Sequence, residues 1–254
     1  MNAHPLNQPP NTTVSGRWRF NYARPNAPFN CQMRCMRCIA PVGPPNARRQ
    51  CARVSCYTLP YCPQHLKLVA HLRIGRTRLI DPATQRRYRF KGLFACIPGQ
   101  PIGALVFAAN QPIVTYFGEH ITQAQLDARY PGANETAPYV EEVLRTVYLP
   151  DPNPPHNPVL YYDQSSYIDG SCMRGVAALA NDSRNGACVG NDPCVANARL
   201  LSGDHNTYPW LTAVAPILNR QEIFVDYGPN YWGGTHHPHV TSPAAAYNRI
   251  EYKC

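Results

Sequence analysis

The amino-acid sequence predicts a mainly β fold with short helices, preceded by a small metal-stabilised module. Between residues 88 and 121, short β-rich runs alternate with Gly/Pro turns, the pattern of strands joined by tight connections. Ahead of these runs, six of the 11 cysteines fall between Cys31 and Cys62. Without a secretory signal, cysteines at such short spacings favour metal binding over disulfides.

Composition limits the classes of protein to which the chain can belong. Hydrophobic residues make up 44% of the 254 residues and charged residues 15%, so most of the chain should be globular. The net charge is +9, and a basic surface attracts acidic partners. No apolar run approaches the roughly 20 residues that cross a bilayer, and none opens the chain as a secretory signal would. We therefore expect a protein of the nucleus or cytoplasm (a host nucleus if it is viral) that binds no membrane. The basic N-terminal region is a candidate for contact with nucleic acid or nucleosomes.

Shifts in composition divide the chain into consecutive parts. A polar, Pro-rich arm, expected to be disordered, precedes the Cys/His module, a connector and the β-rich domain, which contains a Pro-rich insert. The predicted boundaries are 1–30 for the arm, 31–66 for the module, 67–84 for the connector, 85–232 for the domain with its insert at 130–158, and 233–254 for a C-terminal tail.

The β-rich domain begins with strands and one capped helix. The runs at 88–97, 101–109 and 112–121 predict its first strands. Thr122 and Gln125 have the spacing of a capping box, which predicts a helix that ends near Tyr130, before Pro131-Gly132.

The second half of the domain has less regular patterns. Residues 139–149 fit a helix or a strand, and both stay open, whereas residues 159–169 predict a hairpin. Small and apolar residues at helical spacing predict a short buried helix within 170–181, followed by a loop over 181–198. The runs RLLSG, WLTAVAPI and EIFVDYG predict three further strands.

The Cys/His module carries a pattern suited to zinc. Cys38, Cys51, Cys62 and His65 have the form C-x12-C-x10-C-x2-H. Thiolate and imidazole are the ligands of tetrahedral Zn²⁺, and a short Cys-x2-His knuckle preorganises two of them. Metal binding would supply folding free energy to a segment with little core of its own. The order of the four residues resembles small zinc modules that recur in proteins of large DNA viruses.

Further cysteines leave the ligand set open. Cys31, Cys35 and Cys56 are additional candidates and could build part of a second zinc site. The alternative is a set of buried free thiols with an incidental histidine. His236, His237 and His239 lack cysteines in a matching pattern and are not assigned to a site.

Four segments of the β-rich domain carry a resemblance to a known family. Residues 91–95 read KGLFA, and residues 116–119 read YFGE. Residues 167–170 read YIDG and precede Asn181-Asp182-Ser183, and residues 222–228 read EIFVDYG. In this order they resemble the motifs of the SET-domain protein lysine methyltransferases, although each alone is weak evidence. The resemblance covers residues 85–232 and implies the SET-domain β-fold with its C-terminal pseudoknot.

The resemblance implies methylation of a lysine side chain on a protein, with S-adenosylmethionine as methyl donor and a histone tail as the first expected substrate. The amine must be neutral to attack a sulfonium methyl, yet the reference pKa of lysine is about 10.4. A narrow aromatic channel disfavours the ammonium by desolvation, and tyrosine hydroxyls and carbonyls can hold the amine in line. Tyrosines occur in the segments where the family places such a channel.

The resemblance also implies roles for individual residues. Tyr227 matches the tyrosine held essential for catalysis, and Tyr116 matches a tyrosine that lines the channel. Tyr161 is chosen as the third channel residue, with Tyr162 left open because the register is uncertain. For the cofactor, the resemblance implies backbone contacts from Lys91, Gly92 and Leu93, contacts from Asn181 and Asp182, and stacking of Trp232 on adenine.

The sequence departs from the family pattern at several points. Phe90 stands where the family has the first glycine of its G-x-G, and Asp182 stands where it has histidine. Ten residues, 184–193, separate Ser183 from Cys194 and Asn197, which are interpreted as the displaced end of the family's third motif. The post-SET cysteine pattern is absent, so residues 233–254 are a candidate active-site lid.

Two other functions stay open from sequence alone. One is a catalytically weak SET protein that acts as a chromatin or protein-interaction module, favoured by Phe90 and the insert at 184–193. The other makes the arginine-rich zinc module a nucleic-acid binder, with the SET domain as its effector. Tyr227 argues for catalysis.

Overall fold

The structure is a computed structural model that describes most of the chain between residues 19 and 227. For some strand residues (19–23, 32–37, 54–55, 144–148, 160–166 and 187) only the backbone is described. None of the helices in the described part combines the length and apolar character needed to cross a membrane. The described ranges are 19–23, 32–38, 40–44, 49–55, 61–81, 84–88, 90–131, 140–148, 160–170, 175–183, 187–189, 194–201 and 208–227.

The N-terminal part consists of short antiparallel strands. β1 (Arg19–Ala23), β2 (Gln32–Arg37) and β5 (Val54–Ser55) form a sheet in the order β1-β2-β5. β3 (Pro41–Val42) pairs with β4 (Arg49–Gln50). The prediction of a disordered arm over 1–30 is therefore wrong at β1, because its backbone is paired with β2.

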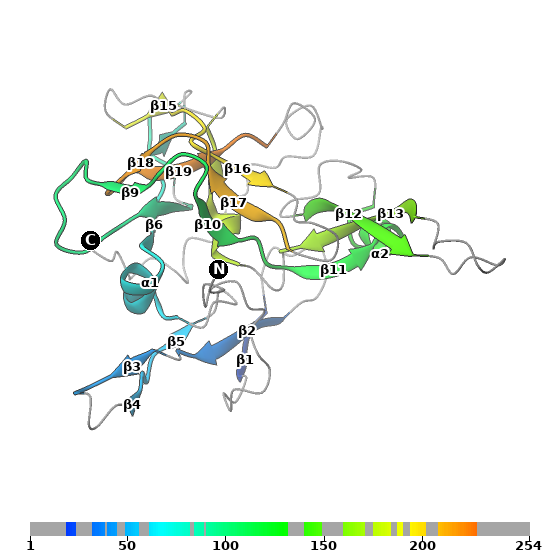
Figure 1. Cartoon of the computed structure of the whole chain (residues 1–254), viewed down its shortest axis with the longest axis horizontal. Helices are drawn as coiled ribbons and strands as arrows, with labels where there is room; N and C mark the ends of the chain where they lie inside the picture. The colour runs from blue at the N-terminus through cyan, green and yellow to red at the C-terminus, as the bar shows by residue number, and fades with distance from the viewer. Residues whose placement is uncertain are drawn as a thin grey trace.

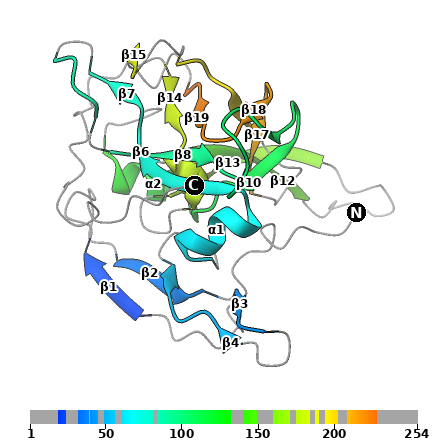
Figure 2. The same cartoon turned by 90° about the vertical axis from the view of Figure 1, so that its left-hand side faces the viewer.

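Helix α1 (Pro63–Val69) lies between these strands and the central sheet, as Figures 1 and 2 both show. Cys62 is its N-cap and Pro63 occupies the first turn, where the missing N–H costs nothing because that group has no helical partner. His65 is also in the first turn, so the helix start positions two of the predicted metal ligands.

The central sheet has the order β14-β19-β8-β6. β14 (Asn181–Asp182) runs parallel to β19 (Glu222–Val225), which is antiparallel to β8 (Lys91–Ala95). β8 also pairs with β6 (Leu72–Arg76), so the segment predicted only as a connector contributes a full strand. The apolar pattern of β6 is only five residues long, too short to predict a strand from the sequence.

Two smaller sheets complete this side of the molecule. β10 (Pro112–Thr115), β17 (Trp210–Ala213) and β16 (Ala198–Leu201) form a sheet in the order β10-β17-β16. β9 (Leu105–Phe107) pairs with β18 (Ile217–Leu218). These elements confirm the strands predicted at 101–109, 112–121 and within the later apolar runs.

Short strands also occur beside the central sheet. β7 (Leu79–Ile80) pairs with β15 (Ala187–Cys188), which lies in the segment predicted as a loop. The loop prediction over 181–198 is therefore wrong at β14 and β15.

One three-stranded sheet projects to one side of the molecule (Figure 1). It consists of β11 (Glu119–Thr122), β13 (Leu160–Asp169) and β12 (Val140–Tyr148), in the order β11-β13-β12. Residues 140–148 are thus a strand, which resolves the open choice for 139–149. The hairpin predicted within 159–169 is wrong: this run is one strand, and the antiparallel partner of β13 along its length is β12.

Helix α2 (Gln123–Arg129) follows β11 directly, as the capping box predicts. Thr122 Oγ1 accepts a hydrogen bond from Gln125 N, and the Gln125 side chain accepts one from Thr122 N. The buried face of the helix places Leu126 against Ile121 and Tyr130. The helix C-cap is Tyr130, in agreement with the predicted end.

The predicted buried helix is present as a single 3₁₀ turn, η4 (Val176–Leu179), whose four residues are all buried. Its alanines allow the close approach of β8 and β10, with which η4 is in contact. The N–H of Ala180 closes the turn by donating to the carbonyl of Ala177.

One hydrophobic core extends through both the cysteine-rich module and the β-rich domain. The same buried cluster contains Cys38, Cys62 and Leu66 of the module, together with Leu72 and Ile74 of β6. A fully buried leucine such as Leu72 contributes roughly 1.5–3 kcal/mol to the free energy of unfolding. The module is therefore anchored to the domain by shared packing.

Arg129, near the end of α2, joins two of the motif segments. Its guanidinium donates to Glu119 Oε1 at 2.8 Å and to Asp169 Oδ2 at 2.9 Å. Asp169 is buried and also accepts a hydrogen bond from the hydroxyl of Tyr130. The two carboxylates raise the pKa of Arg129.

Replacing Arg129 with alanine should lower the free energy of unfolding by about 3 kcal/mol, because it leaves the buried Asp169 carboxylate without its counter-charge. Asp127→Ala on the exposed face of the same helix is the matched control and should change stability by less than about 0.5 kcal/mol. Chemical denaturation of both variants measures the difference. Equal stability of the two variants would show that the ion pair does not hold this sheet.

Candidate functional site

The structure brings the four motif segments together. Asn181 of β14 pairs with Phe224 of β19, and Glu222 of β19 pairs with Phe94 of β8, so three segments share one sheet. The second segment joins the third because Glu119 of β11 pairs with Asp169 of β13. Segments separated by up to 130 residues of sequence thus form one continuous structure.

Lys91 and Gly92 lie where β8 extends beyond its last pair with β19. Leu93, by contrast, is flanked by Ile74 and Ile223 on the two neighbouring strands, and its side chain is fully buried. The Lys91 carbonyl accepts a hydrogen bond from the Asn181 side-chain amide at 3.1 Å. The contacts of Lys91, Gly92 and Leu93 with a cofactor stay predictions.

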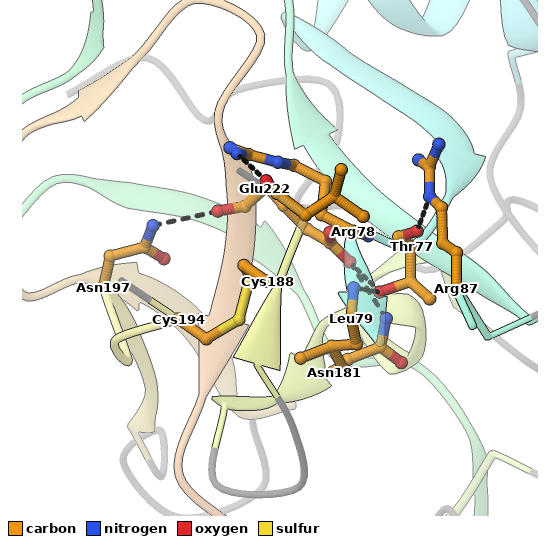
Figure 3. Close-up of a disulfide and its surroundings, with 10 residues drawn as sticks. Thr77, Arg78, Leu79, Arg87, Asn181, Cys188, Cys194, Asn197 and Glu222 are labelled. Atoms are coloured by element: carbon orange, nitrogen blue, oxygen red, sulfur yellow. Dashed lines mark hydrogen bonds between the residues drawn. A yellow bond between two sulfur atoms is a disulfide. The ribbon is translucent and has the colours of Figure 1, made fainter. Parts of the chain in front are cut away.

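Asn181 and Glu222 form a hydrogen bond (Figure 3). Both side chains lie close to Gly92. Asn181 Nδ2 is 3.1 Å from Glu222 Oε1, and this carboxylate also accepts hydrogen bonds from Thr77 Oγ1 and Arg78 N, both at 2.6 Å. Burial raises the pKa of Glu222, while these hydrogen bonds act in the opposite direction. Glu222 begins the fourth motif, but it was not among the site residues predicted from the sequence.

Asp182 has a defined structural role. Its buried carboxylate accepts a hydrogen bond from the backbone N–H of Tyr227 at 2.7 Å. The residue that replaces the family's histidine therefore fixes the backbone just beyond β19, at the predicted catalytic tyrosine.

Tyr227 is held at both its backbone and its hydroxyl. The hydroxyl donates to the carbonyl of Ala180 at 2.7 Å, and the ring packs against the main core. These two hydrogen bonds fix both the main chain and the ring of Tyr227.

The short η4 turn relates Tyr227 to Tyr116. Ala180 at its end receives the Tyr227 hydroxyl, while Gly175 at its start donates its N–H to the carbonyl of Phe117. A 3₁₀ helix rises about 2 Å per residue, so these two contacts lie roughly 10 Å apart along the turn. Tyr116 is buried next to Phe117, which places both tyrosines in the same part of the core.

Tyr208 is an aromatic residue that sequence analysis missed. Its ring lies 4.9 Å from Phe117 and 4.8 Å from His120, measured between ring centroids. The next residue, Pro209, accepts the backbone N–H of Tyr116 at 2.7 Å. Burial raises the pKa of Tyr208. The Tyr-Pro-Trp run before a predicted strand was the only sequence signal for it.

Tyr161 is not placed beside these aromatics. It lies on β13 opposite Val147, eight residues before Asp169, where β13 meets β11. At about 3.3 Å per strand residue, the backbone of Tyr161 is roughly 26 Å along the strand from Asp169. Its side chain and that of Tyr162 are outside the described residues, as is Trp232.

Phe90 packs on the outer side of the central sheet. Its ring stacks on Tyr88 with the centroids 5.0 Å apart, and both pack against the cluster of Leu79, Cys188 and Phe224. The side chain that replaces the family's first glycine therefore has a packing role there.

Cys188, inside the insert at 184–193, is linked to the residue that follows the insert. Cys188 and Cys194 form a disulfide with a Cα–Cα distance of 5.5 Å (Figure 3). Asn197 then clamps β19: its side chain accepts from Phe224 N and donates to the Glu222 carbonyl, both at 2.9 Å. The spacing of Cys188 and Cys194 in the sequence did not by itself predict this disulfide.

The predicted metal ligands Cys38, Cys51, Cys62 and His65 come together, with their ligand atoms all within 4.8 Å of one another. His65 Nδ1 is 3.3 Å from both Cys38 Sγ and Cys62 Sγ. A tetrahedral zinc site with bonds of about 2.0–2.3 Å places neighbouring ligand atoms roughly 3.6 Å apart. The four donors therefore fit a zinc ion in type and spacing.

The electrostatics of this cluster also favour a cation. The three thiols are buried, and burial raises the pKa of Cys38 to about 11, although backbone hydrogen bonds from Cys62 and Ala40 act in the opposite direction. Burial, together with the charge of Arg53, lowers the pKa of His65, which keeps the imidazole neutral. A neutral imidazole is a ligand, and a divalent ion stabilises the thiolates that burial disfavours. Cys31 and Cys56 lie outside the described residues, as does the side chain of Cys35.

No protein-family model and no curated protein matches the sequence. Among solved structures, the chain is similar to the Neurospora SET domain protein DIM-5, a histone lysine methyltransferase. The identity is 21% and the TM-score 0.38, over 62% of this chain and 52% of that one. The matched part thus spans about half the length of that structure.

The fold class predicted from the sequence is confirmed: the described chain is mainly β with two short α-helices, and a Cys/His cluster lies near its N-terminus. The first, third and fourth motif segments are adjacent in one sheet, in the order β14-β19-β8. The C-terminal pseudoknot of the family stays a prediction, because the chain beyond residue 227 lies outside the described residues.

Purified full-length protein should contain zinc, and His65→Ala should lower its zinc content and its thermal stability, because one of four ligands is lost. His120→Ala is the matched control, since His120 is exposed and lies outside the cluster. Elemental analysis and thermal melts of both variants check this expectation. Equal zinc content in the two variants would exclude His65 as a ligand.

Proposed function

We propose that this protein is a SET-type lysine methyltransferase that uses S-adenosylmethionine to methylate a protein. The observation that carries the proposal is the placement of Tyr227. Its backbone is fixed by Asp182, its hydroxyl by Ala180, and both partners flank the Asn181 strand that meets Gly92. The residues that resemble the family's cofactor and catalytic motifs are thereby within one site.

Each of these residues has a role in the proposed reaction. S-adenosylmethionine supplies a methyl group on a positively charged sulfur. The backbone at Lys91 and Gly92, beyond the last pair of β8 with β19, and the amide of Asn181 are suited to bind the cofactor. The hydroxyl oxygen of Tyr227 accepts from the lysine amine and orients the amine lone pair toward the methyl group. Buried aromatic surroundings favour the neutral amine over the ammonium.

The Cys/His cluster would hold a structural zinc ion. Four protein ligands fill a tetrahedral site completely, leaving no position for a reacting water. The shared core and helix α1 connect this centre to β6 of the central sheet. Zinc at this position supports the fold on which the proposed active site stands.

The proposed substrate is a protein segment that contains lysine, with a histone tail as the first choice. A chain with a net charge of +9 is suited to approach nucleosomes, and Arg49 and Arg53 are exposed beside the Cys/His cluster. We therefore propose a location in the nucleus or cytoplasm, with nucleic-acid contact through this basic region.

A catalytically weak interaction module is the second candidate function. It is favoured by the insert at 184–193, which the Cys188–Cys194 disulfide and strand β15 hold beside Leu79. This reading predicts no methyl transfer from S-adenosylmethionine to any histone. The intact hydrogen bonding of Tyr227 supports the catalytic function instead.

Tyr227→Phe should lower kcat for methyl transfer to a histone panel by about 100-fold or more, because it removes an oriented polar group at the reacting amine. S-adenosylmethionine binding should persist, and stability should fall by only about 1 kcal/mol with the lost hydrogen bond to Ala180. Transfer of labelled methyl groups and calorimetry measure the two effects.

Tyr167→Phe is the control for this experiment, since the Tyr167 hydroxyl donates an exposed hydrogen bond to Gln123 of helix α2. Its activity should stay within about twofold of the parent protein. Full activity of Tyr227→Phe would remove Tyr227 from the catalytic role.

A further inference from the structure

Glu222 is a carboxylate almost completely excluded from solvent, with 1% of its surface exposed. Its hydrogen-bond partners are Thr77 Oγ1, Arg78 N and Asn181 Nδ2, which come from three separate parts of the chain. All three are neutral donors. A carboxylate removed from water costs several kcal/mol unless its interactions compensate, so its presence at this position requires a reason.

The hydrogen bonds of Glu222 suit the ionised form. Oε1 accepts from the Thr77 hydroxyl and the Asn181 amide, and Oε2 accepts from the Arg78 N–H. Three donors thus converge on the two carboxylate oxygens. An ionised carboxylate is an acceptor only, and it therefore dictates how each partner is oriented.

The orientation of Asn181 follows from this constraint. Its Nδ2 donates to the Lys91 carbonyl and to Glu222 Oε1, both at 3.1 Å. Both partners can only accept, so the amide cannot be flipped without placing its oxygen against two other oxygens. With Nδ2 engaged in this way, the Asn181 Oδ1 is the acceptor left to meet a ligand.

Gly92 supports the same arrangement. A Cβ built on Gly92 would overlap Glu222 Oε1, lie 2.9 Å from Glu222 Cδ and lie 3.1 Å from Asn181 Nδ2. The carboxylate and the amide thus occupy the space that a side chain at position 92 would take. The glycine of the first motif is required by the contact with Glu222.

We propose that Glu222 is a positioning residue of the cofactor site, which locks the Asn181 amide so that its oxygen faces the ligand. This inference rests on the proposed function, because the ligand whose donor Asn181 would meet is S-adenosylmethionine, which carries an ammonium group. Glu222 does not itself touch the cofactor. It acts through Asn181 and through the backbone at Gly92.

Substitution of Glu222 by glutamine separates this role from simple packing. Glutamine has the same shape as glutamate, but one of its two terminal atoms is an NH₂ donor. That NH₂ group would face either the Asn181 Nδ2 or the Arg78 N–H, both of which are also donors. A flip of Asn181 would remove this mismatch but would set its oxygen against the Lys91 carbonyl. Neither orientation of the Asn181 amide then satisfies all of its neighbours, so its oxygen is no longer held toward the ligand.

The test measures S-adenosylmethionine affinity by calorimetry for the full chain, Glu222→Gln, Asn181→Ala and the double variant. We expect the first two to weaken binding by tenfold or more, and the double variant to match Asn181→Ala within twofold. Thr77→Ser keeps the hydroxyl donor and should bind within twofold of the parent protein. Unchanged affinity in Glu222→Gln, or additive losses in the double variant, would overturn the proposal.

A ligand-free measurement distinguishes this inference from the proposed function. In the parent protein, NMR should show two slowly exchanging side-chain amide hydrogens for Asn181, assigned by their loss in Asn181→Ala. Rapid exchange of these hydrogens would overturn the positioning role even if the cofactor binds. Slow exchange without any cofactor binding would support the Glu222–Asn181 lock and reject the proposed methyltransferase.

Discussion

The parallel pairing of Asn181–Asp182 with Phe224–Val225 is the contact on which the rest of the site depends. It is only two residues long, and so short a ladder is weak without further support. Side chains supply that support: Asp182 binds the Tyr227 N–H, and Asn197 clamps the backbone of Glu222 and Phe224. Tyr227, the proposed catalytic tyrosine, lies just beyond this contact, and Glu222 lies next to it on β19, the strand that pairs with the motif strand β8.

The Cys/His cluster and the central sheet stabilise one another through shared packing. Leu66 of α1 lies in the same buried cluster as Leu72 of β6, and the cluster includes three of the four predicted zinc ligands. A zinc ion bound there would therefore also support β6, the edge of the sheet that pairs with β8. Loss of the metal should affect the candidate active site without any direct contact between the two.

The three buried carboxylates of the described chain, Asp169, Asp182 and Glu222, lie where motif segments meet. Glu222 of the fourth motif binds Asn181 of the third, Asp182 joins the third and fourth, and Asp169 with Arg129 joins the second and third. A hydrogen bond or ion pair of this kind contributes less stability than apolar packing of equal size. It specifies one arrangement of the segments, which a site built from distant parts of the chain requires.

The sequence by itself determined what depends on local chemistry. The capping box at Thr122 and Gln125, the strands at 91–95 and 222–225, and the Cys38, Cys51, Cys62 and His65 set all follow from residue types at short spacing. Only the tertiary structure decided which residues face each other across long separations. The placement of Tyr208 beside Phe117, the distance of Tyr161 from that group, and the disulfide at Cys188 depend on sheet register. Register is set by the packing of the whole core, and no local pattern encodes it.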